Sequence, residues 1–585
     1  MPWKQFIIPR PDQPFPAWRI FPVIFAALYA SHFTLMRLPY YWDEAGYYIP
    51  AAWDFFRTGS LIPLSTLTNA HPPLPSIYLA FWWRLSGFVP EVTRTSVLMV
   101  AALGVTAVWR LAMRLTATPS VAFWSVVLTA LYPVWFAQST LAHADIFAAA
   151  CTLWGLVYAL PEIGSLSSQA PRPAIAAVWF AAAALSKETA IAIPITLAVI
   201  SLVESLRAPG RARIRLWQEA AWFSSCVLPL AAWYIYHYTK TGFLFGNPEY
   251  LRYNAQANLE PLRILAAFGY RILHLTAHMN LFVPVGVAVA ALLLDPRPER
   301  DQGTENRDQG AGVRDQGSSH NSDPSQTLGA PSFRLFSGER VGNHDTQLRP
   351  AIAPSVLRRI FCLLLANALL FSVLGGALLL RYLLPMIPFV LLVAVHTMYR
   401  RAPYWHGLAI FSAAAFVLGL FINPPYRFAP EDNLAYARVI RLHQAGIDQL
   451  EKLYPGSTVL SAWPVTDELT RPELGYLEHP FAVDRIEDFT AQQVARAAQQ
   501  PEKFSTALVF STKYDPQSLP LSLGPKGEAV DEQYFGLHHD LQPEVIALLL
   551  HGSLVWKQED HGQWIALIRF NRQFEAQLNP AFPSK

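Results

Sequence analysis

Long apolar segments separated by short polar ones dominate the first 422 residues of the chain. A helix needs about 20 apolar residues to cross the hydrocarbon core of a bilayer. The pattern therefore predicts a mainly α fold, a polytopic helical membrane protein with about 11 transmembrane helices. The predicted spans are 18–36, 95–115, 120–138, 145–161, 173–186, 189–206, 217–238, 271–294, 356–379, 382–399 and 404–422.

The positions of the basic residues choose between two ways of counting these spans. The stretch 173–206 is also long enough to be one kinked helix. Cytoplasmic loops carry an excess of Lys and Arg. With eleven spans and a cytoplasmic N-terminus, the arginines of 207–215 and 400–401 lie inside, and the acidic first loop lies outside. We therefore prefer eleven spans in the cell (inner) membrane, which place the chain after 422 outside the cytoplasm.

Two regions depart from the apolar pattern. Residues 295–355 are polar and repeat Arg-Asp-Gln-Gly every seven residues without the apolar positions of a coiled coil, so we predict a disordered cytoplasmic linker. Residues 424–585 are predicted to form a soluble extracytoplasmic α/β domain, large enough for its own core. Its predicted helices are 433–453 and 543–550, and its predicted strands are 458–463, 507–511, 553–557 and 564–570.

Composition agrees with a membrane protein. Charged residues make up 15% of the chain, against about 25% in a typical soluble domain. The net charge of +3 gives no argument for a nucleic-acid partner. The three cysteines lie in apolar runs, with no spacing typical of a metal site or a disulfide framework.

Acidic residues follow the first span and begin the fourth. Asp43 and Glu44 come directly after the first apolar run, and Asp145 opens another. Carboxylates near a membrane helix are costly unless they face water or a polar cavity. The alternative is structural, since Asp43 and Asp145 can each cap the helix that follows.

Basic residues occur at three other outer positions. His71 stands in Asn-Ala-His-Pro-Pro-Leu, Lys187 precedes Glu188 in a short turn, and Arg381 begins a span. The structural alternatives are a polar loop histidine, a self-neutralising Lys187–Glu188 pair, and an arginine that extends to the interface. Because the eleven-span topology puts all these residues on one face, together they favour a site for an anionic lipid head group.

The motifs resemble a known family. Asp43-Glu44-x-x-Tyr47 after the first span resembles the Asp-Glu signature of the GT-C glycosyltransferases, in the branch of the protein O-mannosyltransferases and lipid A aminoarabinose transferases. His71-Pro72-Pro73-Leu74 is similar to its basic-Pro-Pro-Leu element. Asp145, Ser186-Lys187 and Arg381-Tyr382-Leu383-Leu384-Pro385 match later elements. The resemblance covers about residues 17–422. His71 stands where the aminoarabinose branch usually has Lys, so the donor sugar of that branch does not carry over.

The resemblance implies transfer of a sugar from a polyprenyl-phosphate carrier to a lipid, glycan or protein acceptor at the outer face, among membrane lipids. It implies that Asp43 is the general base, and that Glu44 and Asp145 orient the acceptor or bind sugar hydroxyls. It also implies that Lys187, Arg381 and, more weakly, His71 bind the donor phosphate, with Tyr47 and Tyr382 beside them. No cofactor is identified, and a divalent metal with unknown ligands stays an open alternative.

Two other classes of protein fit the same pattern. A transporter or flippase of lipid-linked sugars would be indicated by inverted repeats, and we find none in the sequence. A membrane-anchored sensor would place its ligand site in the C-terminal domain, where Thr466-Asp467-Glu468 is one candidate segment. Ligand binding by the isolated fragment 424–585 would distinguish the sensor from the transferase.

Overall fold

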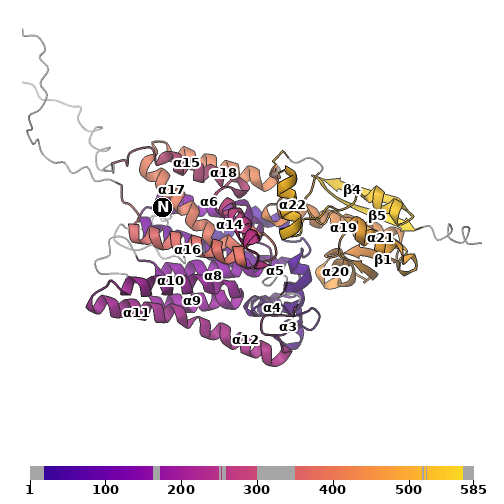
Figure 1. Cartoon of the computed structure of the whole chain (residues 1–585), viewed down its shortest axis with the longest axis horizontal. Helices are drawn as coiled ribbons and strands as arrows, with labels where there is room; N and C mark the ends of the chain where they lie inside the picture. Colours follow the sequence, from indigo (N-terminus) through magenta and orange to yellow (C-terminus); the bar gives the residue numbers. More distant parts are fainter. Residues whose placement is uncertain are drawn as a thin grey trace, which may run out of the picture.

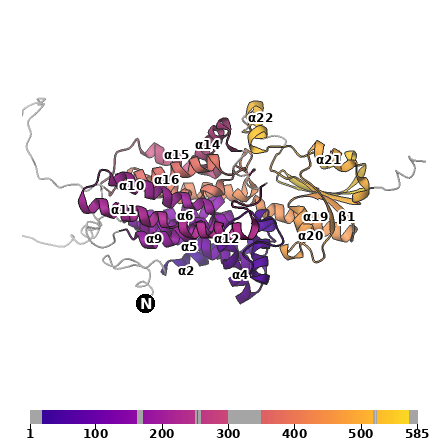
Figure 2. The same cartoon turned by 60° about the horizontal axis from the view of Figure 1, so that its bottom comes forward.

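The computed structural model describes residues 19–161, 171–248, 252, 258–298, 349–516, 520–521 and 524–570. The helices up to residue 421 form an elongated bundle, and a mixed α/β domain lies against one end of it (Figures 1 and 2). The predicted linker falls largely on 299–348, outside the described residues.

The helices of the bundle overlap the predicted spans, although two helices stand at 119–138 and two at 210–241 where one span each was predicted. Many of them begin at a proline, whose fixed φ suits the first turn of a helix. The first half contains α2 (Phe21–His32), α5 (Pro90–Thr116), α6 (Pro119–Leu131), α7 (Pro133–Gln138), α8 (Ala144–Ala159), α9 (Pro173–Ser186) and α10 (Ala192–Ser205). The second half contains α11 (Gly210–Ser225), α12 (Val227–Thr241), α14 (Pro261–Thr276), α15 (Phe282–Ala291), α16 (Pro354–Val373), α17 (Ile387–Arg401) and α18 (Trp405–Phe421).

One predicted span is bent sharply. The segment 271–294 was expected to be a single helix, but α14 and α15 meet at an angle of 99°. The short turn His278–Asn280 joins them, and Met279 and Asn280 have positive φ values of 48° and 65°. Residues on both sides of the bend are apolar, so the apolar pattern continues through it and does not reveal it.

Fewer helices meet the length and composition expected of a transmembrane span than the eleven spans predicted from the sequence. Among the described residues, four helices are long and apolar enough to cross a membrane, or five if the bent pair counts as one span. Five shorter apolar helices accompany them: Phe21–Leu35, Pro119–Leu131, Ala144–Ala159, Pro173–Ser186 and Trp405–Phe421. The apolar helices support an integral membrane protein, and the count of about 11 stays a prediction.

The C-terminal domain contains a five-stranded sheet in the order β2-β1-β3-β5-β4. Strand β1 pairs in parallel with β2 and β3, whereas β5 is antiparallel to β3 and β4. The strands are β1 (Thr458–Ala462), β2 (Ala482–Ile486), β3 (Thr506–Phe510), β4 (Gly552–Asp560) and β5 (Gln563–Phe570). The helices are α19 (Ala435–Leu453), α20 (Val465–Thr470), α21 (Ala491–Ala498), α22 (Gly524–Phe535) and α23 (Pro543–Leu549). The strand β2, at the edge of the sheet, was missed because its five residues carry too weak an alternation.

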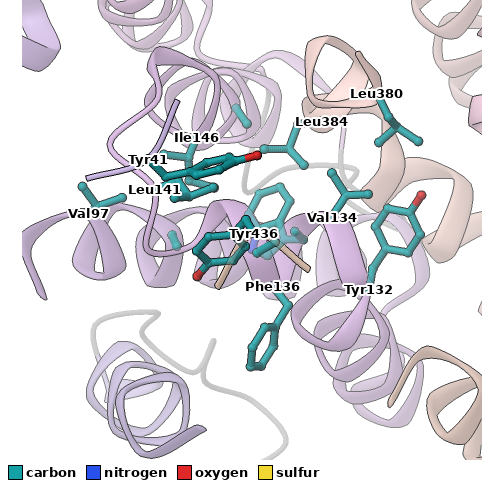
Figure 3. Packing of buried hydrophobic residues seen from close by; sticks show 14 of the residues in the cluster. Tyr41, Val97, Tyr132, Val134, Phe136, Leu141, Ile146, Leu380, Leu384 and Tyr436 are labelled. Atoms are coloured by element: carbon teal, nitrogen blue, oxygen red, sulfur yellow. The ribbon is translucent and has the colours of Figure 1, made fainter. Parts of the chain in front are cut away.

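The two parts share one apolar core. Tyr436 of α19 lies beside Tyr41 of the first outer loop, with ring centroids 5.9 Å apart (Figure 3). The Tyr436 hydroxyl is 3.0 Å from the Thr140 hydroxyl, and the Tyr476 hydroxyl donates to the Tyr40 carbonyl at 3.0 Å. The helices α3 (Ile49–Thr58) and α4 (Leu74–Ser86) of the first outer loop lie at this same end of the bundle (Figure 1). This packing fixes the segments around Tyr40 and Thr140 against the sheet domain.

Candidate active site

A cavity of about 1820 Å³ lies where the bundle meets the C-terminal domain. Its wall combines a group of charged side chains with a broad apolar surface from α14, α16 and the segments that follow α16 and α18. The charged and polar side chains on the wall include Asp43, Tyr47, Tyr48, His71, Lys187, Glu188, Arg381, Tyr382, Glu431 and Asp432. Residues far apart in the sequence thus meet in one chamber.

Arg381 lies at the centre of the charged group. It begins the span Leu380–Arg401, and its side chain is only 4% exposed. Its Nη2 atom forms an ion pair with Asp43, and its Nη1 atom lies 3.1 Å from Glu431 Oε2. Its Nε atom lies 3.6 Å from Asp145 Oδ2. One buried guanidinium therefore holds three carboxylates that come from three separate segments.

Lys187 adds a second buried cation. Its Nζ atom donates to Asp145 Oδ1 at 2.5 Å and lies 4.1 Å from the centre of the Tyr382 ring. Asp145 lines a small adjoining cavity together with Lys187, Arg381 and Tyr382. Asp145 thus fixes both cations from behind, and Tyr382 stabilises Lys187 by a cation–π contact.

His71 lies at the edge of the same group. Its Nδ1 atom is 3.0 Å from Glu188 Oε2, and its ring stacks on Tyr48 at 5.8 Å and meets the edge of Tyr47 at 5.6 Å. The two turns that carry His71 and Glu188 are far apart in sequence, so this pair joins the first outer loop to the start of α10.

Asp43, Asp145, Lys187 and Arg381 do not act as helix caps, as a self-neutralising Lys187–Glu188 pair or as an interface arginine. Asp43 precedes the short turn Glu44–Tyr48 but makes no capping hydrogen bond with its side chain. Asp145 forms ion pairs, Lys187 is paired with Asp145 instead of Glu188, and Arg381 is buried in the protein. The charged side chains therefore belong to one cluster and are not independent helix caps or interface anchors.

Glu44 occupies a different place from Asp43. Its side chain is fully buried and lies outside the set of described residues that line the cavity. It accepts hydrogen bonds from the N–H groups of Tyr41 and Ala142 at 2.9 and 2.6 Å, and it pairs with Arg94 at 3.3 Å. Burial raises the pKa of Glu44, while Arg94 and the two N–H groups oppose that rise. Glu44 thus ties the segment that follows α2 to α5 and to the segment before α8.

Replacing Glu44 with glutamine is expected to reduce the stability of the protein more than its rate of sugar transfer. Arg94 is fully buried and would lose its only carboxylate among the described residues. Breaking a buried ion pair costs about 3–5 kcal/mol. We expect a lower melting temperature in detergent, with transfer per folded molecule within a few-fold of wild type. The control is Glu91→Gln, since Glu91 pairs with Arg37 at the surface, where a pair contributes about 0–1 kcal/mol. Equal melting of the two variants would contradict this structural role.

Two residues of the cluster escaped the sequence analysis. Glu431 lies just after α18, and burial raises its pKa, with the Asp43 carboxylate adding to the rise and Arg381 opposing it. His143 lies with its Nδ1 atom 2.9 Å from Arg381 Nη1, and burial followed by the charge of Arg381 lowers its pKa well below its usual range. Glu431 and Asp432 are adjacent acids in the segment that follows the apolar helix α18, a signal similar to the one that identified Asp43 and Glu44.

No metal ligand set is identified in the described part of the chain, where no group of three or more His, Cys, Asp or Glu side chains has a suitable arrangement. A divalent metal therefore stays an open alternative with unknown ligands, and Asp43, Asp145 and Glu431 form ion pairs with Arg381 or Lys187.

Comparison with known proteins supports the fold. No protein-family model and no curated protein sequence matches the chain. The crystal structure of ArnT from Cupriavidus metallidurans bound to undecaprenyl phosphate is similar, with a TM-score of 0.51 and 13% identity over 94% of this chain and 97% of that one. The apo structure of the same protein gives a TM-score of 0.49 and 13% identity over 94% of this chain and 98% of that one. The similarity to the lipid-bound structure shows that the chain has an ArnT-like fold.

Proposed function

We propose that the protein is a membrane glycosyltransferase that moves a sugar from a polyprenyl-phosphate carrier to an acceptor at the outer face of the membrane. The observation that carries the proposal is the ion pair of Asp43 and Arg381 in a large cavity whose lining combines charged side chains with apolar ones. The similar ArnT structure is bound to undecaprenyl phosphate, which is the class of carrier that we infer for this chain.

Arg381 and Lys187 are our candidates for binding the lipid phosphate. A phosphodiester that loses its sugar becomes a phosphate monoester and gains negative charge. Buried cations placed where this charge develops stabilise the transition state more than the bound donor. Among the three carboxylates on Arg381, Asp43 has the most exposed side chain, at 33% against 3% for Asp145 and 5% for Glu431. The incoming phosphate therefore competes most readily with Asp43.

Asp43 is our candidate for the general base. The acceptor oxygen or nitrogen attacks the anomeric carbon, and the bond from that carbon to the phosphate oxygen breaks with its electron pair on the oxygen. The acceptor loses its proton to Asp43. Displacement of Asp43 from Arg381 by the phosphate would free the carboxylate for this role, so that donor binding prepares the base.

The other predicted site residues take supporting roles in this scheme. Asp145 positions Lys187 and Arg381, and Tyr382 supports Lys187. His71 and Tyr47 lie on the adjoining wall, where they would contact the phosphate or the sugar. Glu44 is too deeply buried to touch either substrate in this arrangement and is assigned a positioning role.

The apolar wall suits the isoprenoid chain of the carrier. It is formed by side chains of α14, α15 and α16 and by the segment after α16. Its members include Leu273, Ala277, Phe282, Phe371, Leu374, Leu378 and Leu379. Burial of apolar surface contributes roughly 25 cal/mol per Å², so a long isoprenoid gains affinity here without any specific polar contact.

The ends of the helices support one orientation in the membrane. Arg381 begins and Arg401 ends the same 22-residue span, so the cavity and the arginines near 400 lie at opposite ends of the bundle. Arg297 and Arg349 also lie at the arginine end, where the Arg297 N–H donates to the Arg400 carbonyl at 2.8 Å. An excess of arginine is typical of the cytoplasmic side, which supports an extracytoplasmic cavity and C-terminal domain.

This orientation predicts the behaviour of reporter fusions. After Lys585, a reporter that works only outside the cytoplasm should be active. Near position 310, a reporter that works only in the cytoplasm should be active. The opposite pair of results would invert the cavity and remove the basis for transfer at the outer face.

The transfer reaction itself is tested with purified protein and a panel of radiolabelled polyprenyl-phosphate sugars. Membrane extract supplies lipid, glycan and protein acceptors. We expect at least one donor to lose its sugar to an acceptor, with release of polyprenyl phosphate. Binding of these lipids without any transfer, coupled to their movement across a vesicle membrane, would instead favour the flippase alternative.

A further inference from the structure

A second group of ionisable residues lies in the wall of the same cavity. His278 and Asp432 both line it, and His278 Nε2 lies 2.9 Å from Asp432 Oδ2. Both side chains are nearly buried, at 8% and 5% exposure. Neither residue has a part in the phosphate cluster or in the proposed proton transfer, and a buried carboxylate in a cavity wall needs an explanation.

Asp432 has an unused acceptor. Within the described residues, its Oδ1 atom is buried and has no hydrogen-bond partner, while its Oδ2 atom is held by His278. A buried acceptor without a partner is unfavourable in the empty protein. A ligand that brings an O–H or N–H group to this position would satisfy it.

The backbone that carries His278 is held in an unusual conformation. It forms the bend between α14 and α15, where Met279 and Asn280 have positive φ values. Three side-chain contacts fix it: the Tyr132 hydroxyl donates to the His278 carbonyl at 3.2 Å, the Met279 N–H donates to the Tyr426 hydroxyl at 3.0 Å, and Asn280 Nδ2 donates to the Ala415 carbonyl at 2.7 Å. Figure 3 includes Tyr132 among the buried side chains of the bundle. Strained backbone that is held by its surroundings is concentrated at ligand sites.

The location limits which ligand group can reach Asp432. The preceding residue, Glu431, contacts Arg381, the proposed ligand of the donor phosphate. Arg381 and Asp432 also line the same cavity, so a group bonded to that phosphate is within reach of Asp432. On one side of the phosphate this is the isoprenoid, which has no O–H or N–H group. On the other side it is the sugar.

We propose that Asp432, oriented by His278, binds a hydroxyl or amino substituent of the transferred sugar through its Oδ1 atom. The assignment rests on the proposed function, because it uses the phosphate site to locate the sugar. It gives the cavity separate sites for the carrier and for the sugar. A site that hydrogen-bonds a substituent strongly rejects an analogue that lacks it, so this pair would select the donor sugar.

The test compares lipids with and without a sugar. Dissociation constants are measured in detergent for undecaprenyl phosphate and for undecaprenyl phosphate bearing glucose, mannose or an aminopentose. Wild type should bind at least one sugar-bearing lipid more tightly than the bare carrier. In Asp432→Asn the amide oxygen still accepts a hydrogen bond but carries no charge, so this advantage should fall by about five- to tenfold, the difference between a hydrogen bond to a charged group and one to a neutral group, while undecaprenyl phosphate binds as before. Loss confined to the hexoses indicates an O–H donor, and loss confined to the aminopentose an N–H donor.

The control and the second variant separate recognition from folding. The control is Glu468→Gln. Glu468 is another buried carboxylate paired with a histidine, since its Oε2 atom lies 2.9 Å from His443 Nδ1, but it lies outside the described lining of the cavity. This variant should keep the preference for the sugar-bearing lipid. If Asp432→Asn does not fold, His278→Gln is measured instead. Glutamine can still donate a hydrogen bond to Asp432 but orients it less well, so the preference for the sugar-bearing lipid should weaken severalfold. An undiminished advantage in the folded variant overturns the assignment, as does a wild type that binds all lipids equally. A wild type that binds no undecaprenyl phosphate removes the proposed function as well.

Discussion

Replacing Asp43 with asparagine is expected to slow sugar transfer by about 10²–10⁴-fold, the usual contribution of a general base. Asparagine has nearly the same size and can still accept a hydrogen bond from Arg381. Arg381 also keeps its contacts with Asp145 and Glu431, and Asp43 makes no helix-capping bond that could be lost. The melting temperature and the affinity for undecaprenyl phosphate should therefore stay near those of wild type.

The matched control for this variant is Asp54→Asn. Asp54 belongs to the same outer segment, is largely buried, and accepts hydrogen bonds from the Leu64 and Ser65 N–H groups at 2.7 and 2.8 Å. Asp54 lies outside the described lining of the cavity. The transfer rate of Asp54→Asn should therefore stay within a few-fold of wild type. A near-wild-type rate in Asp43→Asn would show that Asp43 is not the base.

Replacing Arg381 with methionine should impair both donor binding and stability. Asp145 and Glu431 are buried and would lose their contacts with the guanidinium, and an uncompensated buried charge costs about 3–5 kcal/mol. Lys187→Met should be milder for stability, because Asp145 keeps Arg381. Each variant should weaken binding of undecaprenyl phosphate by about ten- to a hundredfold, since each removes a cation from the proposed phosphate site.

A double variant separates the two effects of losing Arg381. Arg381→Met with Glu431→Gln removes one of the stranded carboxylates, so the melting temperature should recover in part. Binding of undecaprenyl phosphate should not recover, because the cation is still missing. Recovery of both together, or unchanged binding in Arg381→Met, would mean that Arg381 only maintains the fold.

Most of the charged cluster can be predicted from the sequence, because the charged residues and the predicted topology together place them on one face. Asp43, Lys187 and Arg381 lie in segments with no local similarity to one another. They could be grouped because counting spans and arginines puts them on one membrane face. Their pairing within that face was not predictable, since the choice of Asp145 over Glu188 as the partner of Lys187 depends on how α8 and α9 pack. The adjacent acids Asp43 and Glu44 also looked equivalent, although one lines the cavity and the other is buried against Arg94.

Two features were missed for identifiable reasons. Glu431 and Asp432 lie after residue 422, in the part of the chain predicted to be a soluble domain. Acidic residues are common in soluble domains, so they do not indicate a site there. The bend at His278 depends on positive φ values at Met279 and Asn280, which are uncommon for residues other than glycine. An apolar pattern that continues on both sides of a bend is typical of a straight span, so only the three-dimensional structure brings His278 next to Asp432.

The most direct measurement is an experimental structure of the protein with bound undecaprenyl phosphate. We expect phosphate oxygens within about 3 Å of Lys187 Nζ or an Arg381 nitrogen, with the isoprenoid along the wall formed by α14 and α16. Asp43 should have left Arg381 and should face the cavity. A lipid phosphate bound away from both cations, with the Asp43–Arg381 pair intact, would contradict the account.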